Sequence, residues 1–141
     1  MSRRRQVKAD TASAPAPPGE SGAIAHDILV VGAGLAGINT AYRLQTQMPH
    51  LSFTVLEARN GIGGTWDLFR YPGVRSDSDM YTFGFAWHTW RHKLLGSGDE
   101  ILSYLHECVS TYGLDKYLNL RHKVVAADWS SGTQMDCPGG P

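Results

Sequence analysis

The spacing of apolar and polar residues changes twice between residues 27 and 56. Residues 27–31 (DILVV) form a short apolar run that ends at Gly32, which is typical of a strand buried on both faces. From residue 35 to residue 48, apolar and small residues recur every three or four positions, which predicts a helix that Pro49 ends. Residues 51–56 (LSFTVL) predict a second strand. This order predicts a right-handed βαβ unit in a parallel α/β sheet.

Further elements follow along the chain. Asp99 is the predicted cap of a helix whose apolar residues share one face, and Gly113 is expected to end that helix. Residues 118–129 predict one more strand. Residues 58–77 combine Gly, Pro and aromatic residues that break any helical period, so they predict a long loop. Such a loop either covers a bound ligand or only caps the sheet.

The two ends of the chain are poor in large apolar residues. Segments of this composition cannot bury enough surface to offset the entropy lost on ordering. We therefore expect a disordered arm over residues 1–25, one folded domain over residues 26–130 and a disordered tail over residues 131–141. The arm carries several basic residues, which leaves a transit peptide or a contact with an acidic partner as the alternative.

Charge and cysteine content narrow the class of protein. The 141 residues include 13 basic and 13 acidic residues, and this balance argues against nucleic-acid binding. The longest aliphatic run, residues 28–31, is too short for an integral membrane segment. Cys108 and Cys137 have no disulfide or metal-ligand spacing, which favours a cytoplasmic location. Cys108 lies near the apolar face of the second helix, so we expect a buried, inert thiol.

Three glycines follow the first predicted strand with G-x-G-x-x-G spacing. Gly32 allows a sharp turn, Gly34 allows a pyrophosphate to approach the backbone, and Gly37 allows the helix to pack close to the strand. Glu57 comes twenty residues after Gly37, where a carboxylate accepts hydrogen bonds from a ribose and repels a 2′-phosphate. The pattern predicts a site for FAD or NAD rather than NADP, although a glycine-rich loop is also found as a simple turn.

The long loop offers groups that a dinucleotide site uses. Gly63 and Gly64 allow a second close approach of the backbone to a ligand. The loop also supplies flat apolar surface and a few directed polar groups, namely Trp66, Phe69, Tyr71, Asp67, Arg70, Arg75 and Asp77. These residues favour a ligand-covering loop.

Three runs in the sequence carry a specific resemblance. The runs VVGAGLAG, LEAR and GGTWDLFRYPGVRSDSDMYTFGF resemble the N-terminal FAD domain of flavin-containing monooxygenases of the Baeyer–Villiger type, in particular the ethionamide-activating subgroup. The resemblance implies a Rossmann-like FAD-binding domain and the cofactors FAD and NADPH. It also implies molecular oxygen as a partner and a small-molecule ketone, sulfide or amine as the substrate, oxygenated through a C4a-peroxyflavin.

The resemblance also assigns cofactor-binding positions. Gly32, Gly34, Ala36 and Gly37 match the phosphate loop, and Glu57 matches the ribose carboxylate. A second FAD contact is matched by Gly64, Thr65, Trp66, Asp67 and Leu68. A segment between flavin and NADP is matched by Arg75, Ser76 and Asp77, and a contact to the adenine half of FAD is matched by Val124. No catalytic residue is assigned.

The sequence departs from that family in its later parts. Members continue with a second dinucleotide fold and an F-x-G-x-x-x-H-x-x-x-W signature, of which only Gly84 and His88 are matched here. His88 and His92 have zincin-like spacing, but Thr89 occupies the position of the general base, so no metal site is predicted. We therefore expect an N-terminal piece of a monooxygenase; a non-catalytic flavin- or nucleotide-binding fragment is the alternative.

Overall fold

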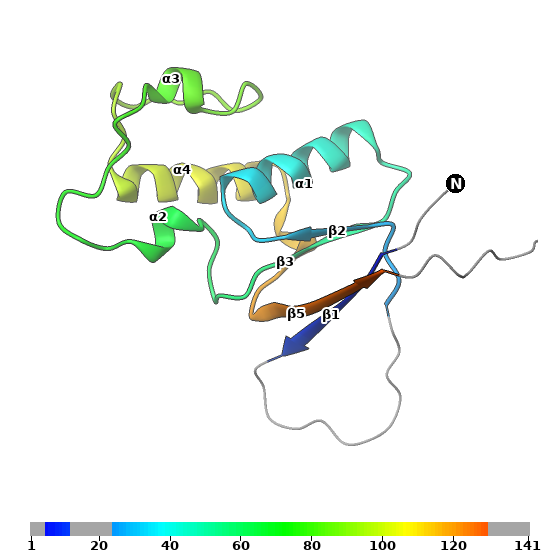
Figure 1. Cartoon of the computed structure of the whole chain (residues 1–141). Helices are drawn as coiled ribbons and strands as arrows, with labels where there is room; N and C mark the ends of the chain where they lie inside the picture. The colour runs from blue at the N-terminus through cyan, green and yellow to red at the C-terminus, as the bar shows by residue number, and fades with distance from the viewer. Residues whose placement is uncertain (1–4, 12–23, 130–141) are drawn as a thin grey trace, which may run out of the picture.

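A short parallel sheet forms the centre of the domain. The structure is a computed structural model that describes residues 5–11 and 24–129. Strand β2 (Ile28–Val31) pairs in parallel with β3 (Phe53–Leu56), and β3 pairs in parallel with β4 (Leu118–Asn119). Helix α1 (Leu35–Gln47) connects β2 to β3, as the sequence pattern predicts. The predicted α/β fold with a Rossmann-like parallel sheet is confirmed (Figure 1).

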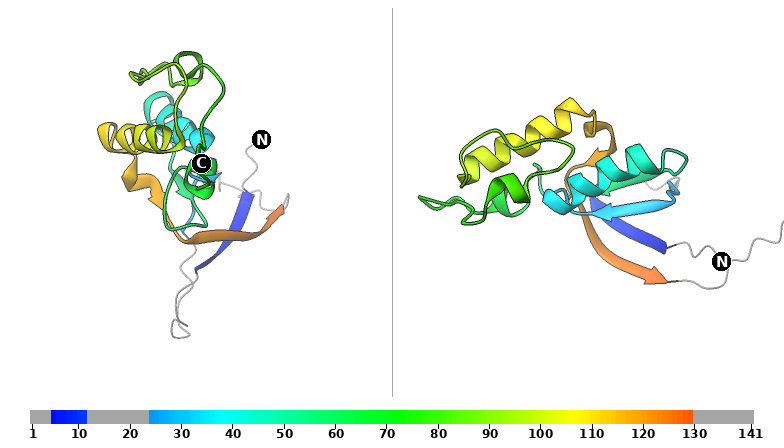
Figure 2. Two further views of the ribbon diagram at one scale, coloured as in Figure 1. Left: turned by 90° about the vertical axis from the view of Figure 1, so that its left-hand side faces the viewer. Right: turned by 90° about the horizontal axis from the view of Figure 1, so that it is seen from above.

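Two helices cover one side of this sheet. Helix α1 lies beside α4 (Gly98–Thr111), while β5 (His122–Trp129) and β1 (Arg5–Thr11) lie on the other side (Figures 1 and 2). The core between sheet and helices consists of fully buried aliphatic side chains, among them Ile38, Ala41, Val55, Ile101 and Leu105. Hydrophobic burial therefore sets the distance and orientation of α1 relative to β2 and β3, which is what positions the loop between them.

The segment from residue 58 to residue 97 is mostly irregular but contains two short helices. Helix α2 (Thr65–Leu68) lies inside the loop predicted for residues 58–77, which is a difference from the prediction. The turn forms because Gly64 takes a φ of +55°, and its carbonyl accepts from the Leu68 N–H at 2.9 Å. Helix α3 (Met80–Phe83) begins at Asp79, whose carboxylate accepts from the Tyr81 N–H at 2.8 Å.

The N-cap of helix α4 lies two residues before the predicted cap. Ser97, not Asp99, is the N-cap, because its hydroxyl accepts from the Glu100 N–H at 3.3 Å while the Glu100 carboxylate accepts from the Ser97 N–H at 2.9 Å. The Ser97 N–H and then the Ser97 hydroxyl, which both donate to the Glu100 carboxylate, lower the pKa of that carboxyl below its ordinary value. The helix ends at Thr111, and Gly113, two residues later, takes a φ of +59° that reverses the chain as predicted.

The prediction of a single strand over residues 118–129 is wrong. After the 3-10 turn η1 (Asp115–Tyr117), β4 ends at Asn119, and Arg121 takes a φ of +61° that turns the chain into β5. Arg121 and His122 then donate backbone hydrogen bonds to the carbonyls of Arg59 and Glu57, both at 2.8 Å. A side-chain pattern cannot reveal this break, since the turn depends on backbone partners more than 60 residues away in sequence.

Strand β1 lies within the arm predicted to be disordered over residues 1–25, and this part of the prediction needs correction. It pairs antiparallel with β5, from Arg5 opposite Trp129 to Thr11 opposite His122, with a bulge between Lys8 and Ala9. Backbone pairing requires no apolar side chains, so an argument from hydrophobic content misses it. The rest of the arm (1–4 and 12–23) and the tail at 131–141 lie outside the described residues.

None of the helices within residues 5–11 and 24–129 combines the length and the apolar character needed to cross a membrane.

Candidate dinucleotide-binding site

The loop between β2 and α1 is organised around backbone groups. Gly32 takes a φ of +95°, which a residue with a Cβ rarely adopts, and its N–H donates to the Leu56 carbonyl at 2.8 Å. Gly34 is the N-cap of α1 and provides no side chain to accept from the first N–H groups of the helix. These N–H groups and the positive end of the helix dipole therefore face the loop, an arrangement that suits a phosphate group.

Two close backbone contacts explain the spacing of the glycines. A Cβ placed on Gly37 would lie 1.9 Å from the Gly32 carbonyl oxygen, so any larger residue would push α1 away from the loop. A Cβ on Gly64 would lie 3.1 Å from the Gly34 Cα, and the Gly63 N–H donates to the Ala33 carbonyl at 2.9 Å. The structure thus brings the two glycine-rich segments together into one backbone surface.

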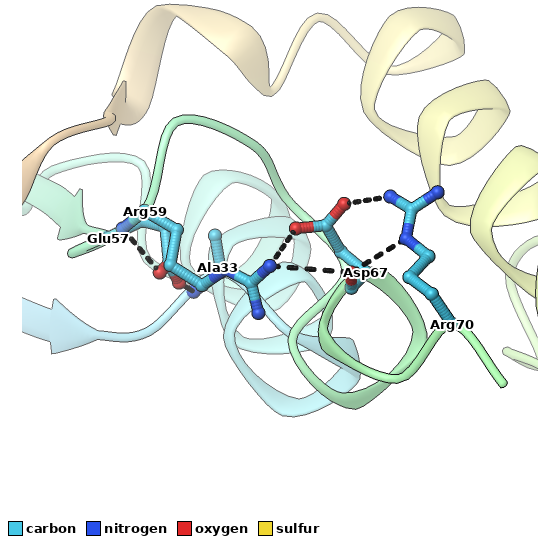
Figure 3. A network of polar contacts seen from close by, with 5 residues as sticks. All are labelled: Ala33, Glu57, Arg59, Asp67 and Arg70. Atoms are coloured by element: carbon cyan, nitrogen blue, oxygen red, sulfur yellow. Dashed lines mark hydrogen bonds and ion pairs between the residues drawn. The ribbon is translucent and has the colours of Figure 1, made fainter.

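Glu57 lies at the carboxyl end of β3, directly beside the glycine loop. The residue is 7% exposed, and its Oε2 accepts from the Ala33 N–H at 2.7 Å (Figure 3). Its Oε1 accepts from the Arg59 N–H at 2.9 Å. A carboxylate has about four acceptor positions, so Glu57 can hold the loop and still accept hydrogen bonds from ribose hydroxyls.

An ion network extends from this carboxylate toward α2. The Asp67 carboxylate receives Nη2 of Arg59 at 2.8 Å and Nη2 of Arg70 at 2.6 Å (Figure 3). The Asp67 side chain is only 15% exposed, whereas that of Arg70 is 61% exposed. Asp67, a residue of α2, therefore holds this helix against the Arg59 side chain. Arg59 is not among the residues predicted from the sequence, although it ends the LEAR run two residues after Glu57.

The remaining predicted residues occupy the periphery of this surface. Ala36 is exposed in the first turn of α1, and Thr65, Trp66 and Leu68 form α2 just beyond Gly64. Val124 lies in β5, two residues after His122, whose N–H donates to the Glu57 carbonyl.

Arg75, Ser76 and Asp77 make their polar contacts with one another and with neighbouring loop residues. Arg75 pairs with Asp77 at 2.9 Å, with side chains 62% and 79% exposed, and the Ser76 N–H donates to the Gly96 carbonyl. Within the described part of the chain, no hydrogen bond or ion pair connects these three residues to the residues of the glycine loop.

Cys108 belongs to the core and not to this site. Its side chain is fully buried in α4, as predicted, and burial raises the pKa of the Cys108 thiol to about 12. Over the described ranges 5–11 and 24–129, no three His, Cys, Asp or Glu side chains gather in a way that could hold a metal ion.

The fold and the site together define a class of protein. A parallel strand, a glycine-rich turn, the start of a helix and a carboxylate at the end of the next strand are the parts of a Rossmann-like dinucleotide-binding domain. A family described as NAD(P)-binding Rossmann-like domain matches residues 30–105, more than half of the 141 residues, and the chain belongs to this family.

Relatives narrow the comparison further. The chain is 47% identical over 106 residues to "FAD-containing monooxygenase EthA" of Mycobacterium tuberculosis, and 49% identical over 109 residues to "Probable FAD-binding monooxygenase AlmA" of Acinetobacter baylyi. These alignments cover 74% and 77% of this chain but 22% of each relative. A solved structure, "Oxidized steroid monooxygenase bound to NADP", is 29% identical with a TM-score of 0.63, covering 68% of this chain and 19% of its own. The predicted resemblance to flavin monooxygenases is confirmed, and the chain spans about a fifth of the length of these relatives.

Proposed function

We propose that this chain binds FAD and forms the FAD-binding part of an NADPH-dependent flavin monooxygenase. The observation that carries the proposal is the joint surface of the two glycine segments, closed on one side by the Glu57 carboxylate. Gly34 and Gly64 carry no side chain where their backbones meet, so no Cβ separates the two segments on which a dinucleotide would lie. The relatives named as FAD-containing or FAD-binding monooxygenases support FAD as the dinucleotide.

The donor and acceptor groups fit the adenosine diphosphate half of FAD. The N-terminal N–H groups of α1 are suited to the pyrophosphate, which carries negative charge. Glu57 is suited to the adenosine ribose, since its carboxylate accepts from hydroxyl groups. The same negative charge disfavours the 2′-phosphate of NADPH at this position, so NADPH is expected to bind elsewhere.

The chemistry itself belongs to the cofactor. When bound, FAD supplies electron transfer from NADPH and the transfer of one oxygen atom from molecular oxygen to a substrate. The residues of this chain hold the adenosine half in place, and α2 with Trp66 covers the adjoining surface. A ketone, sulfide or amine is the proposed substrate class, by similarity to Baeyer–Villiger type enzymes. We propose a cytoplasmic location, because a free buried thiol such as Cys108 is typical of a reducing compartment.

A titration of the purified chain with FAD tests this function. The informative variant is Gly34→Ala, because the added Cβ lies 3.6 Å from the nearest protein atom and leaves the fold intact while it occupies space needed by a ligand. We expect FAD affinity to fall about tenfold or more, since steric conflicts of about 1–3 kcal/mol correspond to that range. Gly61→Ala is the matched control, with its nearest contact at 3.8 Å, and it should bind FAD normally.

Two results would contradict the proposal. Binding of NAD with no measurable binding of FAD would indicate a nucleotide-binding fragment outside the flavoproteins. Equal FAD affinity in the wild type and in Gly34→Ala would remove the glycine loop from the binding site.

A further inference from the structure

The backbone of Glu57 is held from both sides by the turn that joins β4 to β5. Its N–H donates to the Asn119 carbonyl at 2.9 Å, and its carbonyl accepts from the His122 N–H at 2.8 Å. Between these two partners, Arg121 takes a φ of +61° and turns the chain into β5. The turn therefore fixes the Cα from which the Glu57 side chain reaches the glycine loop.

The position of this turn depends on a side-chain contact between β4 and β3. Strand β4 is only two residues long, so few backbone hydrogen bonds hold it to β3. Asn119 adds a contact, since its Nδ2 donates to Oγ1 of Thr54 in β3. Thr54 is 6% exposed, and its hydroxyl donates in turn to the Tyr117 carbonyl at 3.1 Å. The donor and an acceptor position of this buried hydroxyl are both used to tie the short strand to β3.

The Asn119 amide and the Glu57 carboxylate lie on opposite faces of the sheet. Asn119 is opposite Leu56 in the register, so its side chain shares a face with Leu56 and Thr54. Side chains alternate along a strand, and Glu57, three residues after Thr54, is therefore directed to the other face. Asn119 can act on the carboxylate only through the backbone hydrogen bond from the Glu57 N–H to its own carbonyl.

We propose that Asn119 is a positioning residue for Glu57, and that its contact with Thr54 determines how well the site distinguishes a ribose from a 2′-deoxyribose. The inference rests on the proposed function and deepens it. The Glu57 carboxylate already accepts from the N–H groups of Ala33 and Arg59, at 2.7 and 2.9 Å (Figure 3). Its remaining acceptor positions meet a 2′-hydroxyl only if the Glu57 backbone stays in place, because hydrogen bonds weaken with small changes in distance and angle.

Binding of ADP and of 2′-deoxy-ADP to the full chain tests the inference, because the ratio of their dissociation constants reports the contact with the 2′-hydroxyl. The wild type should bind ADP roughly 10-fold to 100-fold more tightly, the range of one hydrogen bond to a charged group. Asn119→Ala removes the amide but keeps the backbone carbonyl, and it should lower this ratio to about threefold or less through weaker ADP binding. Asn60→Ala is the matched control, because Asn60 is exposed and its side chain makes no hydrogen bond within residues 5–11 and 24–129; it should keep the wild-type ratio.

Two variants of Thr54 test the same contact from β3. Thr54→Val has nearly the shape of threonine but lacks the hydroxyl, so it should lower the ratio as Asn119→Ala does. Thr54→Ser keeps the hydroxyl and should keep the wild-type ratio. The double variant of Asn119→Ala with Thr54→Val should be no worse than either single variant, since both remove one shared contact.

NMR on the unmodified chain covers the case in which these variants do not fold. The side-chain amide signals of Asn119 should shift more with ADP than with 2′-deoxy-ADP, whereas those of Asn60 should respond equally to both. An equal response at Asn119 would overturn the inference.

The binding ratios separate a positioning role from a structural one. Equal losses of ADP and 2′-deoxy-ADP binding in Asn119→Ala would overturn the inference, because they would reduce Asn119 to a support of the fold. An unchanged ratio in Asn119→Ala, or equal binding of the two nucleotides by the wild type, would overturn it as well and leave FAD binding by the chain intact. Absence of FAD and ADP binding in the wild type would instead refute the proposed function, and the inference with it.

Discussion

Replacement of Gly37 by alanine tests the closest packing contact of the site. The Cβ of the new residue would lie 1.9 Å from the Gly32 carbonyl oxygen and 3.0 Å from the Gly32 carbonyl carbon. Both are backbone atoms, so no side-chain rotation relieves the conflict. Ordinary contacts begin at 3.4 Å, and α1 must therefore move by about 1.5 Å relative to the end of β2.

The size of the effect follows from two opposing contributions. Overpacking of this kind costs about 1–3 kcal/mol and occasionally more, and a conflict between two backbones belongs at the upper end. Alanine gains about 1 kcal/mol over glycine in helix propensity. We expect a net loss of about 2 kcal/mol in the free energy of unfolding, which in a domain of about 100 residues lowers the thermal midpoint by roughly 10 °C.

Urea and thermal unfolding, followed by far-UV circular dichroism, measure this loss. Gly34→Ala is the control in the same loop, since its Cβ would lie 3.6 Å from the nearest atom and its φ of −81° suits alanine. It should unfold within about 0.5 kcal/mol of the wild type. If Gly37→Ala unfolds at the wild-type midpoint with an unchanged urea slope, the helix does not pack against the loop as closely as described.

Three further predictions concern single side chains. Glu57→Gln should weaken FAD binding by about 1–3 kcal/mol and lower the thermal midpoint, because an amide replaces the carboxylate that accepts from the Ala33 and Arg59 N–H groups. A titration with FAD measures the affinity, and a melting curve measures the midpoint. If both are unchanged, the Glu57 carboxylate neither binds FAD nor stabilises the loop. Ser97→Ala should destabilise the domain by about 1 kcal/mol through loss of the cap. The same change should raise the pKa of Glu100 toward its ordinary value in an NMR titration, and an unmoved pKa would contradict the capping role. Because the pKa of Glu100 is lowered in the folded wild type, the stability that this carboxylate contributes is present above its unfolded pKa and is lost as the pH falls through its folded pKa. In a Cys137→Ser background, Cys108 should resist a thiol reagent at pH 8 until the chain is unfolded, because burial raises the pKa of its thiol to about 12. Rapid labelling of the native chain would show instead that the Cys108 thiol is accessible.

Several features of the fold could be predicted because they depend on residues close together in sequence. The alternation of an apolar run, a glycine turn and a helical stripe is enough to specify β2, α1 and β3. The positions of Gly32 and Gly37 follow from backbone requirements that few other residues satisfy. The burial of Cys108 follows from its place on the apolar face of α4.

Other features arise from partners that are distant in sequence. The predicted strand over residues 118–129 is divided because the backbone of Arg121 and His122 binds carbonyls at the end of β3. The cap of α4 moves to Ser97 because the capping interactions are reciprocal, and Asp99 makes no such pair. Strand β1 forms through pairing with β5, which leaves no signature in its side chains.

The sequence by itself determined that a dinucleotide-binding βαβ unit is present, because glycine spacing and strand and helix periods are local properties of the chain. Only the tertiary structure decided how the site is assembled: it set Gly64 against Gly34, placed Glu57 on the Ala33 N–H, and directed Arg59 between that loop and Asp67. These contacts join residues up to 30 positions apart, and their geometry depends on how far the packed core brings β3 and α2 toward the loop. Hydrogen bonds are sensitive to tenths of an ångström, so no pattern of residue types specifies them.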